Sequence, residues 1–226
     1  MIYFTAIPFL FLVSILVHAE IKKNMKRIKI FKPLCSLLLV AYVLFSPFSG
    51  HIDTVLFSGI LTAMLFSLGG DISLIFQNQK KFFLFGLVLF LLGHISYGIT
   101  FSLLSDFILY DLFTALLLAV LFAVLLFLFK SGAQGIPASV IAYMLIISFM
   151  MNRAFSTRFS DSFSLRQSGC IIAGSALFYI SDVLLAWNRF YKPFRYHRIS
   201  LFFYYSGQFL IISSREKNDD VKRPAR

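Results

Sequence analysis

Hydrophobic runs of helical length alternate with short polar segments along nearly the whole chain. Such runs approach or exceed the roughly 18–20 apolar residues that an α-helix needs to cross a bilayer. The pattern therefore predicts eight membrane-spanning helices, over residues 2–19, 33–49, 55–76, 82–104, 108–129, 136–152, 168–187 and 198–213. The last run is the shortest, and its length also suits a re-entrant segment.

Composition supports the same class of protein. The chain has 226 residues, of which 59% are hydrophobic and 14% charged, and its mean hydropathy is +0.83. These values are typical of an all-α, polytopic membrane bundle and not of a soluble domain. We expect one transmembrane domain over residues 1–214 and a short polar tail over 215–226.

Lysine and arginine gather in alternate connections, which predicts the orientation of the chain. One side holds Lys22, Lys23, Lys26, Arg27, Lys29, Lys32, Lys80, Lys81, Lys130, Arg189, Lys192, Arg195 and Arg198. The other side holds only Arg153, Arg158 and Arg166, in a polar connection over 153–167 that we expect to be a solvated loop. Because the positive side is cytoplasmic, we expect a multi-pass protein of the bacterial inner (cell) membrane with its N-terminus outside. The net charge of +11 is then explained by topology and by anionic membrane lipids, so no nucleic acid is expected as a partner.

Two carboxylates lie deep inside predicted spans, five residues from the nearer end. Asp71 belongs to the span 55–76 and Asp182 to the span 168–187. A charged residue within a span costs roughly 2.5–3.5 kcal/mol on insertion scales, and chains retain one mostly where it faces a polar interior. Both spans run toward the cytoplasm, so both aspartates lie roughly 8–9 Å from the cytoplasmic ends of their helices. They can therefore share a cavity near that leaflet, with a polar helix-packing bond as the alternative interpretation.

The span 82–104 carries a histidine and a tyrosine on one helical face. Phe90, His94 and Tyr97 follow the i, i+4, i+7 spacing of that face, and Gly86 and Gly93 lie on a neighbouring strip. Small residues on such a strip allow the close approach of a second helix. His94 is a candidate for chemistry, with a hydrogen-bonded core histidine as the alternative.

Further polar groups lie in the inner half or the middle of the later spans. They are Tyr143, Tyr204, Tyr205 and Gln208. Lys32, at the start of the second predicted span, can reach either a carboxylate or a lipid phosphate. Arg189, seven residues after Asp182, either pairs with a phosphate or marks the end of its helix.

Several classes of site lack their motif. The sequence contains no G-x-S-x-G elbow, no H-E-x-x-H, no Cys/His cluster and no glycine-rich phosphate loop. Cys35 and Cys170 fall in separate apolar spans, where they fit small buried hydrophobes. We therefore expect no metal and no cofactor, and carboxylate acid–base chemistry in a dry site remains.

Short motifs follow one another in a fixed order from the second span to the last. They are Lys32-Pro33, Gly70-Asp71, F-L-L-G-H-I-S-Y over 90–97, the segment from Tyr143 to Met150, F-Y-I-S-D-V-L-L-A-W-N-R-F over 178–190 and Y-Y-S-G-Q over 204–208. Together they resemble the YhhN-like lysoplasmalogenase family over nearly the whole chain. The resemblance implies an eight-helix fold and a lysophospholipid substrate. The implied reaction is hydrolysis of the vinyl ether bond of lysoplasmalogens, with choline or ethanolamine headgroups, to a fatty aldehyde and a glycerophospho-base.

Two carboxylates suit the reaction that the resemblance implies. Acid cleaves a vinyl ether by protonating its β-carbon, after which the oxocarbenium ion takes up water and the hemiacetal collapses. Glycosidases use a pair of carboxylates against a similar cation. We predict Asp182 as the acid and Asp71 as the base, with His94 as a third catalytic residue that orients water. The predicted substrate-binding residues are Lys32, Tyr97, Tyr143, Arg189, Tyr204, Tyr205 and Gln208.

Two other classes of protein remain open. A lipid transporter or an ion- or proton-coupled transporter can bind a cation or proton at the same acidic pair, although no inverted repeat or pair of broken helices is visible. A non-catalytic membrane scaffold needs the aspartates for stability only. Aldehyde release by purified protein separates the hydrolase from both, since transport predicts flux in sealed vesicles without aldehyde.

Overall fold

The computed structural model describes residues 2–45, 51–130, 138–194 and 197–215. These residues form eight α-helices and no strand: α1 (Ile2–Ile21), α2 (Met25–Phe45), α3 (His51–Leu74), α4 (Lys80–Leu103), α5 (Leu109–Lys130), α6 (Ala138–Ser156), α7 (Leu165–Ala186) and α8 (Ser200–Ser213). A five-residue π-helical segment, η1 (Trp187–Tyr191), follows α7, and a short 3₁₀ turn, η2 (His197–Ile199), precedes α8. The predicted all-α bundle is confirmed.

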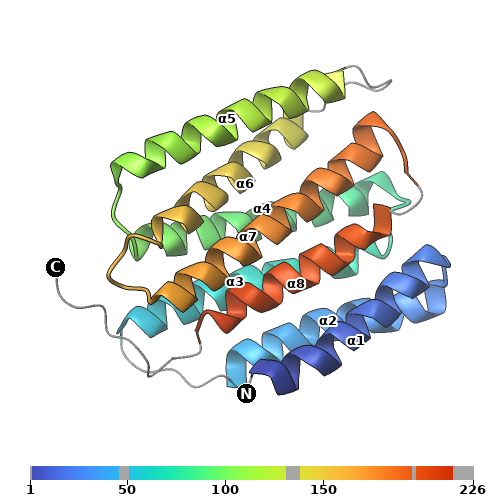
Figure 1. Ribbon diagram of the computed structural model, residues 1–226. Coiled ribbons are helices and arrows are strands. Elements are labelled where there is room, and N and C mark those ends of the chain that lie inside the picture. Colours follow the sequence, from blue (N-terminus) through green and yellow to red (C-terminus); the bar gives the residue numbers. More distant parts are fainter. Residues whose placement is uncertain (1, 46–50, 131–137, 195–196, 216–226) are drawn as a thin grey trace.

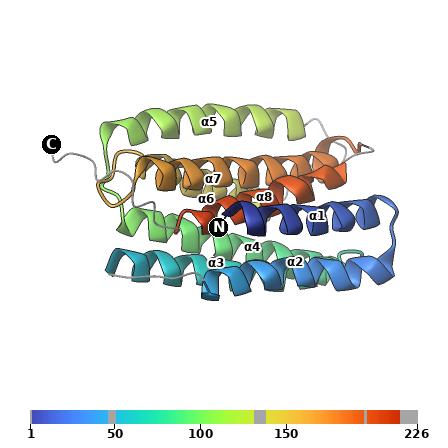
Figure 2. The ribbon, with the colours of Figure 1, turned by 60° about the horizontal axis from the view of Figure 1, so that its bottom comes forward.

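Six of the helices close into a ring around the core of the bundle. In ring order α2, α3, α4, α6, α7 and α8 each pack against the next, and α8 packs back against α2. Two helices lie outside the ring: α1 packs on α2 and α8, and α5 packs on α6 (Figures 1 and 2). The ring matters for function because its interior collects polar side chains from all six helices.

The helices differ in length, and the short last run of the prediction is the shortest of the eight helices in the described residues. Six of the described helices, α2 to α7, are long and apolar enough to cross a membrane, and the described part of α1 is shorter. With 14 residues, α8 is about 21 Å long, less than the ~30 Å hydrocarbon core of a bilayer. It tolerates this length because most of its residues are buried within the protein.

Glycines bring two helix pairs into close contact. The predicted packing strip on α4 is confirmed, since a Cβ at Gly93 would lie 3.3 Å from the Ala63 carbonyl oxygen of α3. Where α7 crosses α8, a Cβ at Gly174 or at Gly207 would lie 2.6 Å from the carbonyl oxygen of the other glycine. Any larger residue at this crossing would push α7 and α8 apart, and both helices carry site residues.

The start of α2 differs from the prediction. The helix begins at Met25 and contains Pro33, so Lys32 is the eighth residue of α2 and does not lie at a helix end. The reason is local, because the Asn24 side chain accepts a hydrogen bond from the Arg27 N–H at 3.2 Å and so caps the new helix start. This earlier start carries Lys32 into the protein interior.

The expectation of a solvated loop over 153–167 is wrong for its first residues. Helix α6 continues to Ser156, and Arg153 is buried with its Nη1 donating to Asp111 Oδ2 at 2.9 Å. Ser156 donates to the other oxygen of Asp111 at 2.5 Å. This buried cluster ties the start of α5 to the end of α6, so Arg153 is a structural residue.

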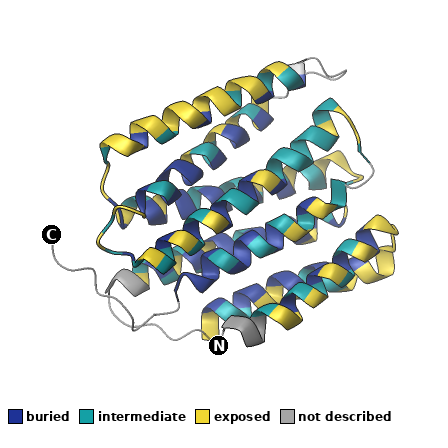
Figure 3. Ribbon diagram, in the orientation of Figure 1, coloured by how far each residue is buried: buried dark blue, intermediate teal, exposed yellow. Residues whose placement is uncertain are grey.

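The burial pattern separates a lipid-facing surface from the polar interior (Figure 3). Most of α5 is exposed although its side chains are apolar, as expected of a helix that faces lipid. The connections 22–24 and 75–79 and the described residues 192–194 and 197–199 lie at one end of the bundle, which we call the basic end (Figure 1). Arg195 and the expected tail from residue 216 onward lie outside the described residues, whereas Arg215 is buried and donates to the Val43 carbonyl at 2.8 Å.

Candidate active site

Asp182 on α7 meets two side chains from neighbouring helices. The Tyr143 hydroxyl of α6 donates to Asp182 Oδ2 at 2.7 Å. His94 Nε2 of α4 lies 3.0 Å from the same oxygen and 2.9 Å from the Tyr143 hydroxyl. The other ring nitrogen of His94 contacts Met150 Sδ at 3.3 Å. Because both contacts fall on Oδ2, the described surroundings leave Asp182 Oδ1 for a ligand.

Asp71 on α3 has more hydrogen-bond partners than Asp182. Its Oδ2 accepts hydrogen bonds from Ser36 at 2.6 Å, Tyr204 at 2.9 Å and Tyr205 at 3.1 Å. The Lys32 ammonium lies 3.7 Å from Oδ1, and both side chains of this pair are almost fully buried. Helices α2, α3 and α8 therefore converge on one carboxylate, whose charge is compensated by a buried lysine.

A second layer of polar contacts lies behind Asp71. The Tyr97 hydroxyl donates to Gln208 Oε1 at 2.7 Å, and Gln208 Nε2 donates to Ser67 at 3.0 Å. Both Tyr97 and Gln208 are fully buried. They satisfy one another between α4, α8 and α3, so their polarity is explained by helix packing.

A central chamber joins the two aspartates. Asp71, Lys32 and Tyr204 line it on one side, and Asp182 and Tyr143 line it on the other. The sequence-based expectation that two carboxylates at one depth share a cavity agrees with this arrangement.

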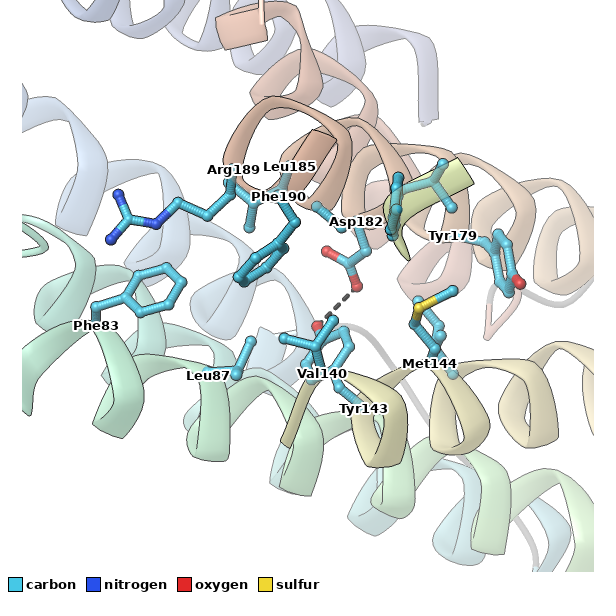
Figure 4. A pocket seen from close by; sticks show the side chains of 14 residues that line it. Phe83, Leu87, Val140, Tyr143, Met144, Tyr179, Asp182, Leu185, Arg189 and Phe190 are labelled. Carbon is cyan, nitrogen blue, oxygen red and sulfur yellow. Dashed lines mark hydrogen bonds between the residues drawn. The ribbon is translucent and has the colours of Figure 1, made fainter. Parts of the chain in front are cut away.

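An apolar cavity opens on the other side of Asp182 (Figure 4). It runs along α7 between α4 and α6, from Phe83 and Arg189 at the basic end to Tyr179, with Asp182 between them (Figure 4). Apart from Asp182, Tyr143, Tyr179 and Arg189, its lining is hydrocarbon or aromatic. The Asp182 carboxylate thus lies where an apolar slot meets a polar chamber.

A polar vestibule forms at the basic end, where the other two cavities approach the surface. It is lined by Gln77, Asn78, Phe83, Leu185, Asn188, Arg189, His197 and Arg198. It shares Gln77, His197 and Arg198 with the central chamber and Arg189 with the apolar cavity. The π-helical segment η1 places Asn188 and Arg189 here, and π segments often occur at functional sites.

The structure brings most of the predicted site residues together, though not in equal roles. Lys32, Tyr143 and Tyr204 line the chamber beside the aspartates, and Arg189 lines the apolar cavity and the vestibule. His94, Tyr97, Tyr205 and Gln208 line none of these three cavities, and they contact other site residues from behind. A residue in that position does not touch a ligand directly.

Sequence reasoning missed several contributors, among them the vestibule amides Gln77, Asn78 and Asn188. Ser36 lies one helical turn after Lys32, but a serine in an apolar span usually bonds its own backbone and attracts no notice. His197 and Arg198 follow a short connection whose charge was explained by topology alone. The sequence feature that could have identified these two residues is their position directly before α8, which packs back into the ring of helices.

Comparisons with known proteins agree with one another. The model of the YhhN family matches residues 28–215, a range that contains every site residue described above. Lysoplasmalogenase TMEM86A of Homo sapiens is 31% identical over 166 residues, covering 72% of this chain and 68% of that protein. Lysoplasmalogenase TMEM86A of Bos taurus is 29% identical over 170 residues, covering 72% and 69%. No solved structure matches the chain.

Proposed function

This chain belongs to the YhhN family, and from that premise we propose that it is a lysoplasmalogenase. The proposed reaction is hydrolysis of the vinyl ether bond of a 1-alkenyl lysophospholipid within the membrane. The products are a fatty aldehyde, which stays in the lipid, and a glycerophospho-base, which is soluble in water.

The observation that carries the proposal is the position of Asp182. It lies between an apolar cavity that fits an alkenyl chain and a polar chamber that fits the glycerol part of a lysolipid. The vinyl ether is the group of this substrate that joins an apolar part to a polar part. A lipid with its chain among Leu87, Met144 and Phe190 therefore presents that bond to the carboxyl group.

The proposed chemistry balances with one water molecule. Protonated Asp182 gives its proton to the β-carbon of the vinyl ether, and the resulting oxocarbenium ion is attacked by water at the carbon next to oxygen. One proton of that water passes to the Asp182 carboxylate and restores the acid. The hemiacetal then breaks its bond to the glycerol oxygen, and its hydroxyl proton moves to that oxygen, so an aldehyde and a free glycerol hydroxyl are released. Positioned acids of this kind contribute about 10²–10⁴-fold to a rate.

Asp71 is proposed as the second carboxylate of the pair. It faces the same chamber as Asp182, and its negative charge stabilises the cation across that chamber. Lys32, predicted as a ligand of the lipid phosphate, is reassigned to compensate the charge of Asp71, since the two are buried 3.7 Å apart. His94 is reassigned from orienting water to positioning Asp182, because it contacts Asp182 Oδ2 and lines no cavity described above.

The orientation that we propose follows the positive-inside rule. The lysines and arginines of the 22–24 and 75–79 connections and of their flanking helix ends favour a cytoplasmic basic end. The lipid then enters from the inner leaflet of the cell membrane, and the soluble product leaves through the vestibule toward the cytoplasm.

The test uses purified protein in detergent with a panel of lysolipids. We expect aldehyde release from 1-alkenyl-glycerophosphoethanolamine and 1-alkenyl-glycerophosphocholine, and none from the matched 1-acyl ester or 1-alkyl ether lipids. Aldehyde is measured by reduction with borohydride and mass spectrometry. Flux of lipid or protons in sealed vesicles without aldehyde would assign the site to transport and end the proposal.

A further inference from the structure

The vestibule collects cations and amides from three separate segments of the chain. Arg189 and Asn188 come from η1, Arg198 and His197 from η2, and Gln77 and Asn78 from the 75–79 connection. Among the described residues that line it there is no carboxylate. The chemistry presented to a ligand is therefore positive and rich in hydrogen-bond donors.

Local contacts leave these donors available. Asn188 Oδ1 accepts a hydrogen bond from the Phe194 N–H at 3.2 Å, so the Asn188 side chain offers its N–H₂ group. Arg198 uses Nη1 to pair with Glu20 Oε2 of α1 at 3.3 Å, which fixes the side chain and leaves other N–H groups of its guanidinium. Arg189 lies over the Phe83 ring, 5.0 Å from its centre, and forms no ion pair with any residue that the structure describes.

We propose that the vestibule binds the phosphodiester of the lysolipid through Arg189 and Arg198 and does not read the amine of the headgroup. The proposal rests on the proposed function and names the group by which the substrate is held. A planar guanidinium matches two phosphate oxygens at once. An ammonium or trimethylammonium group finds no carboxylate in this vestibule, so choline and ethanolamine lipids are expected to bind alike.

The spacing from Asp182 on α7 to Arg189 on η1 allows one lipid to reach both residues. Arg189 follows Asp182 by seven residues, a rise of about 10 Å along a helix. Five bonds join the ether oxygen at the first glycerol carbon to phosphorus, an extended distance of about 6 Å. The Arg189 side chain spans the difference between these two distances. A phosphate held in the vestibule therefore leaves the ether oxygen at the depth of Asp182.

The test measures binding without catalysis. Two saturated ethers, 1-alkyl-glycerophosphoethanolamine and 1-alkylglycerol, have no vinyl bond to cleave and differ in the phosphate headgroup. Trp187, the single tryptophan of the chain, lies in η1 directly before Asn188 and reports binding by its fluorescence. We expect the phospholipid to bind at least tenfold more tightly than the glycerol ether in the same detergent, and its choline analogue to match it within about twofold.

Variants sharpen the measurement. Arg189→Gln alters an exposed side chain and should fold. It is expected to reduce about tenfold the ratio by which the phospholipid binds more tightly than the glycerol ether. The double variant Glu20→Gln with Arg198→Gln removes the second guanidinium together with its buried partner carboxylate, so that neither charge is left unpaired. Added to Arg189→Gln, it should reduce the preference for the phospholipid over the glycerol ether further. Lys80→Gln, an exposed cation of the basic end that lines none of the three cavities, is the matched control and should change nothing.

The outcomes separate the two proposals. Equal binding of both ethers, or an unchanged preference in both arginine variants, overturns the phosphate assignment even if aldehyde is released from alkenyl lipids. Absence of aldehyde together with a strong, arginine-dependent preference leaves the phosphate site standing and overturns the proposed reaction.

A competition experiment distinguishes a lipid headgroup from a free phosphate ion. Bound 1-alkyl-glycerophosphoethanolamine is followed by Trp187 fluorescence, and either glycerophosphoethanolamine or inorganic phosphate is added at the same concentration. Displacement by glycerophosphoethanolamine but not by inorganic phosphate supports a lipid headgroup. Stronger displacement by inorganic phosphate would assign the vestibule to a free anion instead.

Discussion

The two carboxylates of the chamber have opposite surroundings. Asp71 accepts three hydroxyl hydrogen bonds, pairs with the Lys32 ammonium and has a side chain 1% exposed. Asp182 contacts one hydroxyl and one imidazole, both at Oδ2, and retains 15% exposure at the meeting of two cavities. One carboxylate is saturated with partners from the protein, and the other keeps an oxygen for a ligand.

This difference teaches how two identical side chains can take two roles. A carboxylate fixed by a lysine and three hydroxyls is suited to remain a stationary negative charge. A carboxylate with a free oxygen at an apolar cavity can approach a carbon atom and exchange a proton with it. We therefore assign proton transfer to Asp182 and charge stabilisation to Asp71, and each prediction below tests that division.

The largest effect is expected at the free carboxylate. Asp182→Asn keeps the shape of the side chain and an oxygen for the Tyr143 hydroxyl, but it removes the acidic proton. We expect the kcat for aldehyde release to fall about 10²–10⁴-fold with little change in thermal unfolding. Asp161→Asn, at an exposed loop carboxylate, is the control and should retain full activity. Substantial turnover by Asp182→Asn would mean that another group supplies the proton.

Substitutions at Asp71, the carboxylate saturated with protein partners, should first lower the stability of the fold. Asp71→Leu or Lys32→Met leaves one charge buried without its partner, at a cost of about 3–5 kcal/mol in the free energy of unfolding. The double variant Lys32→Met with Asp71→Leu should recover most of that loss and still release no aldehyde. Unfolding in detergent and aldehyde release, measured on the three variants, complete the cycle. An active double variant would show that the pair serves packing alone.

His94 should act through Asp182 and not through the substrate. His94→Gln removes the imidazole at Oδ2 and is expected to lower kcat about 10–100-fold, because a hydrogen bond to a charged group contributes about 1.5–3 kcal/mol. The KM should stay within about twofold of the original value, since His94 lines no cavity that the lipid occupies. A rise in KM without a fall in kcat would place His94 in contact with the substrate.

The smallest effect separates the two tyrosines. Tyr143→Phe and Tyr204→Phe each remove one hydroxyl donor to an aspartate Oδ2, a change of about 0.5–1.5 kcal/mol. We expect Tyr143→Phe to lower kcat about 2–10-fold, because Asp182 has few other partners. Tyr204→Phe should change kcat less, because Ser36 and Tyr205 still hold Asp71. The reverse order in paired kinetic assays would contradict the division of roles.

The fold was largely predictable because hydrophobic length and helix-breaking positions are local properties. One error was local, because the Asn24 side chain caps α2 at the Arg27 N–H and so starts the helix earlier than predicted. The other depends on a distant contact, because Asp111 draws Arg153 out of the expected loop. That partner cannot be assigned without knowing that α5 and α6 are neighbours.

The candidate site was predictable only as far as the depth of each residue along its helix. Depth along a helix follows from counting residues, and it placed Asp71 and Asp182 at one level, where they line one chamber. Which face meets which helix does not follow from counting. Tyr97 and Gln208 have the right polarity and depth but bond each other, and Arg198 entered the sequence reasoning only as a topological charge.

Proton transfer to carbon is tested most directly by running the reaction in deuterated water. Purified protein is given 1-alkenyl-glycerophosphoethanolamine, and the aldehyde is reduced at once with borohydride so that later exchange is prevented. Protonation of the β-carbon predicts one deuterium at the second carbon of the fatty alcohol with the unaltered protein, and almost no alcohol with Asp182→Asn. Alcohol without deuterium at that carbon, or labelled alcohol formed at full rate by Asp182→Asn, would contradict proton delivery by Asp182.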